Sequence, residues 1–246
     1  MSVAQYVYGV VEPDFPTPRG KGIAGSRLSL VTGEDVAALV SSIDEGGLRF
    51  GREEMMVHSR VLERALAQGT VLPMRFGIVM SGPEEIHSRL LDEYGGELRE
   101  QLDELAGKVE VRIRATYDEE LLLREIVRDD PEIADLRASM RGTSDDATYY
   151  ARIRLGELVA AAVEHRRARD AQTIVDALSG AALAVEPSSA AHERIVLQAS
   201  FLVERARLAR FDRVLEDVAQ GYGGFIRFKY TGPLPPHSFV QLAERV

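Results

Sequence analysis

The sequence predicts an α+β protein of two domains within 246 residues. Two observations carry this prediction. Short apolar or alternating runs, which are typical of strands, recur along the chain between longer stretches in which apolar residues return at helical spacing. Gly107 separates two such sets. We therefore expect an N-terminal α+β domain over residues 1–107 and a C-terminal domain over residues 108–246.

The N-terminal domain is expected to begin with a buried strand at residues 6–11, because this run is almost wholly apolar. A helix is predicted over residues 32–40, where Thr32 is a favourable cap and two acidic residues occupy the first turn. In the helix predicted at 52–68, the pair Met55 and Met56 is expected to pack in the core. The other elements expected in this domain are strands at 26–31 and 70–76 and a helix that begins at Pro83 and runs to Leu105.

The C-terminal domain is expected to open with a half-buried strand at residues 109–115, in which apolar residues alternate with charged ones. The elements that follow are a helix at 118–128, a long helix at 148–178, strands at 181–186 and 194–203, a helix around 211–218 and a last strand at 225–230. This order is β, α, β, β, α, β with extra helical residues in the first crossover. It predicts a modified ferredoxin-like βαββαβ sandwich with inserted helices.

A proline-rich tail follows the last predicted strand. Three prolines and a glycine are expected to forbid a regular element for about half a dozen residues. Such a stiff, extended tail can be laid over another surface at low entropic cost. It is predicted either to dock on a partner or to fold back as a clasp between the domains, through Tyr230, Pro233, Pro235, Pro236 and Phe239.

A second unusual stretch lies at residues 71–77, where Pro73 and Arg75 interrupt an otherwise apolar strand. A proline removes a hydrogen bond of the sheet and a buried arginine is costly, so both require an edge or an interface. Arg75 and Phe76 therefore join the tail residues as predicted partner-binding or clasp residues.

The composition disfavours several classes of function. A net charge of −9 argues against a nucleic-acid partner and an anionic membrane surface, and the absence of cysteine excludes thiolate chemistry. The N-terminus lacks the pattern of a signal peptide, and no apolar run approaches the ~20 residues of a membrane span. A cytoplasmic location is the simplest expectation.

No reaction centre is recognisable in the sequence. The five histidines, His58 among them, are not spaced as metal ligands and are expected at the surface or at the rim of the core. The segment 20–25 matches a dinucleotide-binding glycine pattern, but a proline-rich loop precedes it and a strand follows it. We expect no catalytic residue, no metal and no cofactor.

Four blocks in order along the chain resemble the GvpF/GvpL family of gas vesicle proteins. They are YVYGVV at 6–11, LPMRFG at 72–77, VEVRIRA at 109–115 with the Tyr117-Asp118 that follows, and KYTGPLPPHSF at 229–239. The resemblance does not separate F-type from L-type members.

The resemblance implies a minor, non-enzymatic component of the gas vesicle that acts in assembly and binds the small hydrophobic shell protein GvpA and other Gvp proteins. Sheet edges or exposed apolar helix faces are the surfaces expected to hold GvpA. The alternative is an enzyme or a small-ligand-binding protein on a ferredoxin-like scaffold, because one fold can serve many functions.

Overall fold

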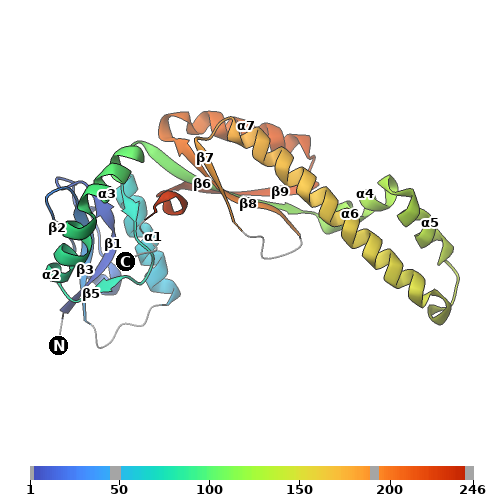
Figure 1. The fold of residues 1–246 in the computed structure, drawn as a ribbon, viewed down its shortest axis with the longest axis horizontal. Coiled ribbons are helices and arrows are strands. Elements are labelled where there is room, and N and C mark those ends of the chain that lie inside the picture. The colour runs from blue at the N-terminus through green and yellow to red at the C-terminus, as the bar shows by residue number, and fades with distance from the viewer. Residues whose placement is uncertain (1–2, 45–50, 189–193, 242–246) are drawn as a thin grey trace. The chain divides into compact units, whose positions relative to one another are not determined.

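The computed structural model describes residues 3–44, 51–188 and 194–241 (Figure 1). The chain divides into two compact units. Unit 1 consists of Met1–Val111, Leu202–Ala206 and Gly232–Val246, and unit 2 consists of Arg112–Phe201 and Arg207–Thr231. The C-terminal segment therefore belongs to the same unit as the N-terminal half of the chain.

Unit 1 is built on an antiparallel sheet in the order β2-β3-β1-β4, with β5 also paired to β1. Its strands are β1 (Val3–Val11), β2 (Leu28–Thr32), β3 (Ala37–Asp44), β4 (Leu72–Pro73) and β5 (Val79–Met80). The register of β1 and β3 shifts between Val7 and Gly9. A Cβ atom at Gly9 would lie 2.6 Å from the Leu72 carbonyl oxygen, so only glycine lets the strands approach this closely.

The helix predicted over residues 32–40 is wrong, because this segment forms the end of β2, a tight turn and the start of β3. The Gly33 N–H donates to the Val36 carbonyl across the turn at 2.8 Å. Residues 36–40 are five consecutive apolar residues, and all of them are fully buried. An unbroken apolar run suits a strand that is covered on both faces, and this burial outweighed the capping signal at Thr32.

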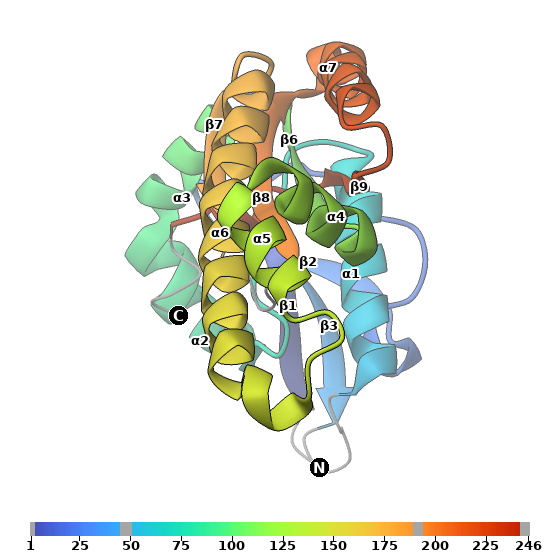
Figure 2. The ribbon, with the colours of Figure 1, turned by 90° about the vertical axis from the view of Figure 1, so that its right-hand side faces the viewer.

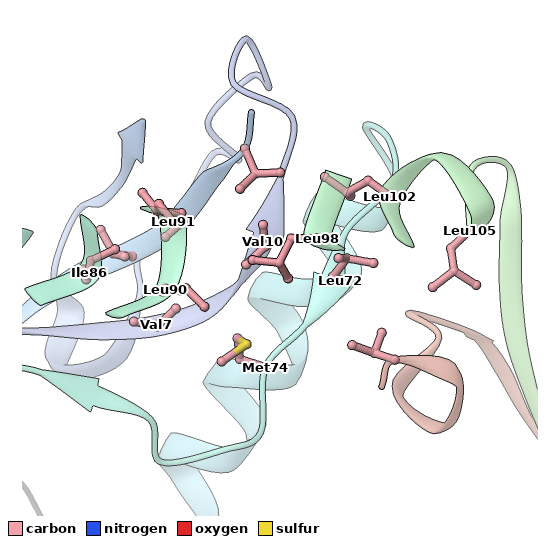
Figure 3. Packing of buried hydrophobic residues seen from close by; sticks show 14 of the residues in the cluster. Val7, Val10, Leu72, Met74, Ile86, Leu90, Leu91, Leu98, Leu102 and Leu105 are labelled. Carbon is pink, nitrogen blue, oxygen red and sulfur yellow. The ribbon is translucent and has the colours of Figure 1, made fainter. Parts of the chain in front are cut away.

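Helices cover both faces of this sheet, with α1 (Arg52–Leu66) and α3 (Asp92–Glu104) on opposite sides (Figures 1 and 2). The helix predicted from Pro83 is confirmed as α2 (Pro83–Ile86), a π-helical turn (His87–Leu91) and α3. The core on the α3 side is shown in Figure 3 and includes Val7, Val10, Leu72, Met74, Ile86, Leu90, Leu91, Leu98, Leu102 and Leu105.

Two details of the N-terminal prediction are wrong. Met55 and Met56 do not pack in the core, since their exposed fractions are 52% and 51%. The stripe that α1 buries is instead formed by His58, Val61, Leu62 and Ala65. The predicted strand at 70–76 is reduced to the two residues of β4.

Unit 2 contains most of a second antiparallel sheet, in the order β7-β8-β6-β9. The predicted order of elements is confirmed, with α5 as a helix that was not predicted. The elements are β6 (Lys108–Tyr117), α4 (Glu119–Asp129), α5 (Pro131–Ser139), α6 (Asp145–Ser179), β7 (Ala184–Pro187), β8 (Ile195–Glu204), α7 (Leu208–Gly221) and β9 (Ile226–Leu234). The Tyr117 N–H donates to the Arg194 carbonyl and the Asp118 N–H to the Phe225 carbonyl, so the end of β6 meets the beginnings of β8 and β9.

The helices of unit 2 lie on one face of its sheet. Tyr117 at the end of β6 bonds to Asp170 of α6, and Phe201 of β8 packs on Phe211 of α7. Apolar residues of β6 face these helices and are buried, whereas Arg112 and Arg114 between them are exposed. The alternation read from the sequence thus corresponds to a covered and an open face.

The prediction that the prolines forbid a regular element is wrong for the first residues of the tail. β9 continues through Gly232 and Pro233 to Leu234, with a cis peptide bond between Gly232 and Pro233. β9 lies at the end of the strand order, where a sheet tolerates proline. A short 3-10 turn (His237–Phe239) follows.

Candidate functional site

The C-terminal segment, residues 232–241, packs against the rest of unit 1. A Cβ atom at Gly232 would lie 3.1 Å from the Glu110 carbonyl oxygen, so the segment runs very close to the backbone of β6. Pro235 and Pro236 are buried, and Val240 belongs to the core cluster on which Phe239 packs. The apolar side chains of the tail are therefore part of a core.

Two polar contacts fix the register of this segment. The Ser238 N–H and hydroxyl donate to the two carboxylate oxygens of Glu110, at 2.7 and 3.0 Å, and the side chain of Glu110 is fully buried. The Gln241 N–H donates to Gln101 Oε1 of α3 at 3.1 Å. Hydrogen bonds to a carboxylate are stronger than neutral ones, and removing the donors would leave a buried charge short of partners.

Arg75 and Phe76 lie in different surroundings although they are neighbours in sequence. Arg75 is exposed. The ring of Phe76 is partly buried, 5.7 Å from the His58 ring and 6.3 Å from the Tyr6 ring. Phe76 therefore belongs to an aromatic cluster on the α1 side of the sheet.

His58 is the centre of this cluster and is only 3% exposed, so the expected surface or rim position is wrong for this histidine. Its Nδ1 lies 2.9 Å from the Tyr6 hydroxyl, which also accepts the Gly77 N–H at 2.9 Å. Burial and, to a smaller degree, the nearby His237 lower the pKa of His58 to about 4. The ring is neutral at pH 7 and ties α1 to the chain around residues 74–77. The available sequence signal was its place on the apolar stripe of α1.

Tyr8 holds the glycine-rich segment in a similar way. Its hydroxyl accepts the Ile23 N–H at 2.7 Å and lies 2.8 Å from Ser41 Oγ. Burial raises the pKa of Tyr8, so the phenol is neutral. A Cβ atom at Gly22 would lie 2.4 Å from the Tyr8 hydroxyl, so the glycine makes room for this contact.

Tyr230 belongs to unit 2, whereas the other six predicted residues belong to unit 1. Its side chain is 37% exposed, and burial together with the Asp212 carboxylate raises its pKa to about 12. A hydrogen bond to Asp212 of α7 accounts for its orientation toward the helices.

A groove between α4 and α6 was missed from the sequence. It has a volume of about 620 Å³, and its small and apolar lining residues are Leu122, Leu123, Gly156, Val159, Ala160 and Val163. Ion pairs lie on its rim, between Arg194 and Glu119 and between Arg167 and Glu164. The volume falls in the range of binding clefts.

A network of buried polar groups supports this groove. The Tyr117 hydroxyl donates to Asp170 at 2.7 Å, and Arg166 bonds to Asp170 at 3.2 Å and to Glu125 of α4 at 3.1 Å. The guanidinium lies 5.0 Å from the centre of the Phe225 ring. Burial, and next the Asp170 carboxylate, raise the pKa of Tyr117. These contacts tie α4 and α6 to each other and to the sheet.

Neither a metal centre nor a membrane span is found in the described part of the chain. In residues 3–44, 51–188 and 194–241, no three His, Asp or Glu side chains gather as metal ligands would. None of the helices described is both long and apolar enough to cross a membrane.

Known proteins match this chain over nearly its full length. The model of the family described as "Gas vesicle synthesis protein GvpL/GvpF" matches residues 4–241. The chain is 36% identical to gas vesicle protein F of a Streptomyces species, over 97% of this chain and 100% of the relative, and 27% identical to that of Microcystis aeruginosa, over 98% and 100%.

Solved structures are similar as well. The crystal structure of GvpF from Microcystis aeruginosa matches with a TM-score of 0.78 at 26% identity, covering 97% of this chain and 99% of that chain. The crystal structure of GvpF from an Anabaena species has a TM-score of 0.86 at 24% identity, over 98% and 99%, and supports the fold.

Proposed function

The chain belongs to the GvpL/GvpF family of gas vesicle proteins, and from this premise we propose that it is an accessory protein of gas vesicle assembly that binds the shell protein GvpA and other Gvp proteins. The role is non-enzymatic and takes place in the cytoplasm, at the growing vesicle. The protein holds the hydrophobic GvpA subunit before or during its polymerisation and keeps it from unproductive contacts.

The groove between α4 and α6 is the observation that carries this proposal. Its lining is apolar, while its rim is charged, which is the arrangement of a site that takes an apolar helix face and leaves the polar face in water. Gly156 and Ala160 lie one helical turn apart on α6, and their small side chains let a second backbone approach α6 closely. Leu123, which lines the groove, is 41% exposed.

A pull-down of GvpA with the intact protein tests the proposal. Val159→Asp together with Leu123→Asp places two charges in the groove, and we expect recovery of GvpA to fall at least tenfold with an unchanged circular dichroism spectrum. Met55→Asp is the matched control, because Met55 is as exposed but lies on α1. If the folded wild-type protein recovers no GvpA, binding is refuted, and if only Met55→Asp abolishes recovery, the groove is the wrong surface.

For the tail residues Pro233, Pro235, Pro236 and Phe239 we propose a clasp within unit 1. Burial of Pro235 and Pro236 and the Ser238–Glu110 bonds support this role. Truncation after Gly232 is expected to lower the melting temperature of the protein by several degrees, because it opens the core at Val240. Unchanged stability with lost GvpA binding would show instead that the tail docks on a partner.

We interpret the second sheet and its helices as a modified ferredoxin-like sandwich. The strand order β7-β8-β6-β9 and the crossovers through α4–α6 and α7 support this interpretation. This scaffold also serves enzymes and ligand-binding proteins, so the alternative function is tested by melting the protein with nucleotides or metal ions. A shift of the melting temperature by one of these ligands would favour that alternative.

A further inference from the structure

Four basic side chains share the open face of the sheet in unit 2, in a chain whose net charge is −9. Arg112 and Arg114 lie on β6, and Arg227 and Lys229 lie on the neighbouring strand β9. All four are exposed, and Arg227 forms an ion pair with Asp118 at 3.6 Å. We call these four residues the basic face.

The register of β6 and β9 brings the four cations together. The Asp118 N–H donates to the Phe225 carbonyl at one end of the pair, and Gly232 lies against Val111 at the other. Both contacts correspond to one antiparallel register, in which Arg114 lies opposite Lys229. Arg112 and Arg227 each lie two residues from these positions on the same strand. Side chains directly opposite each other share a face and have Cβ atoms about 5 Å apart.

The basic face points away from the helices of unit 2. The residues that alternate with its members, such as Ile113 on β6 and Tyr230 on β9, belong to the face that α6 and α7 cover. Like charges placed opposite each other weaken a sheet, and β9 is an edge strand that charges can protect from edge-to-edge pairing. Charge of either sign protects an edge strand, however, whereas binding an acidic partner requires positive charge.

A stripe of carboxylates with the complementary charge runs along α3. Glu93, Glu97, Glu100 and Glu104 are exposed, and their spacing of four, three and four residues places them on one side of the helix, over about 16 Å. Within the described part of the chain, none of the four forms an ion pair. We call these four residues the acidic stripe.

The acidic stripe also borders a hollow that fits a long basic side chain. The hollow has a volume of about 230 Å³ and is lined by Glu97, Glu100, Glu104 and Phe239 among others. Carboxylates beside an aromatic ring form a good receptor for a guanidinium group, because both attract the cation.

We propose that the protein associates head to tail with copies of itself, and that the acidic stripe of one copy binds the basic face of the next. One end of each assembly then presents an unoccupied basic face and the other end an unoccupied acidic stripe, so the contact is heterologous and produces chains of copies. A net charge of −9 repels nucleic acids and anionic lipids, whereas a second copy offers a local stripe whose charge is opposite to that of the basic face.

Sedimentation velocity of the full chain tests the proposal. At about 20 mM salt we expect a sedimentation coefficient that rises with protein concentration, and at about 500 mM salt we expect monomers, because salt screens exposed charges. Arg114→Glu with Lys229→Glu reverses the basic face, and Glu97→Lys with Glu100→Lys reverses the acidic stripe. Each variant alone is expected to remain monomeric at low salt.

An equimolar mixture of the two variants provides the decisive readout. The reversed face of one variant complements the reversed stripe of the other, so association is expected to return in the mixture. Arg210→Glu with Arg213→Glu on α7 changes the net charge as much as the reversal of the basic face and is expected to associate as the wild type does. Monomeric wild-type protein at low salt would overturn the proposal, as would a mixture that stays monomeric or wild-type protein that binds anionic vesicles without self-association.

Discussion

The two sheets of the molecule differ in how they are covered. In the first sheet, residues 37–40 of β3 are all fully buried, because helices pack on both faces (Figure 2). In the second sheet, β6 alternates between buried apolar residues and the exposed Arg112 and Arg114. The first sheet is thus covered on both faces, while β6 of the second sheet exposes charged side chains on one face.

Both units bury neutral as well as charged polar groups. Unit 1 contains the neutral pairs Tyr6–His58 and Tyr8–Ser41 together with the buried carboxylate of Glu110. In unit 2 a partly buried charged pair, Arg166 and Asp170, lies beside the groove. Neutral pairs in a closed core respond to pH when one member must become charged, whereas charged pairs near a groove depend on the bonds that compensate their burial.

The largest expected effect comes from making one substitution in both regions. Leu98→Ala removes a side chain that is 1% exposed in the core of unit 1, and we expect it to lower the free energy of unfolding by about 3 kcal/mol. Leu123→Ala, at a position that is 41% exposed beside the groove, is expected to cost less than about 0.5 kcal/mol. Urea unfolding followed by circular dichroism measures both. Equal losses would contradict the assignment of stability to unit 1.

A second prediction concerns the neutral histidine of unit 1. The pKa of His58 is about 4 in the folded protein and near 6.5 in the unfolded chain, so the unfolded state binds more protons between these values. The contribution of His58 to stability is therefore complete above pH 6.5 and is lost as the pH falls toward 4. At pH 5 the loss amounts to about 2 kcal/mol.

Urea unfolding at pH 7.5 and pH 5 of the wild type and of His58→Gln measures this loss. The variant is expected to be less stable at pH 7.5 but to lose about 2 kcal/mol less than the wild type on acidification. His165→Gln is the control, because His165 is exposed on α6. A pH dependence that His58→Gln leaves unchanged would refute the assignment.

The order of elements could be predicted from the sequence because the spacing at which apolar residues recur is a local property of the chain. The errors arose where the local sequence is compatible with two kinds of secondary structure and tertiary packing decides between them. Thr32 is a good helix cap, yet the apolar run that follows fills the middle of a sheet, and Pro233 was taken as the end of regular structure although an edge strand accommodates it.

Most of the candidate sites could not be found in the sequence for a related reason. The groove depends on how α4 packs beside α6, and the basic face depends on the register that sets Lys229 opposite Arg114. Register and helix packing are contacts between distant residues, and no local pattern encodes them. For His58 a local signal existed in the apolar stripe of α1, but the residue was expected at the surface or at the rim of the core.

The smallest effect that we predict tests the charged network of unit 2. Tyr117→Phe removes the hydroxyl that donates to Asp170 but leaves Arg166 within 3.2 Å of the same carboxylate. Because one strong partner remains, we expect a loss of about 1 kcal/mol in the free energy of unfolding. Tyr150→Phe, at a position that is 83% exposed, is the matched control and is expected to have no measurable effect. A loss as large as that of Leu98→Ala would mean that unit 2 depends on a single buried charge pair, and the contrast between a closed, stabilising sheet and an open, binding one would have to be abandoned.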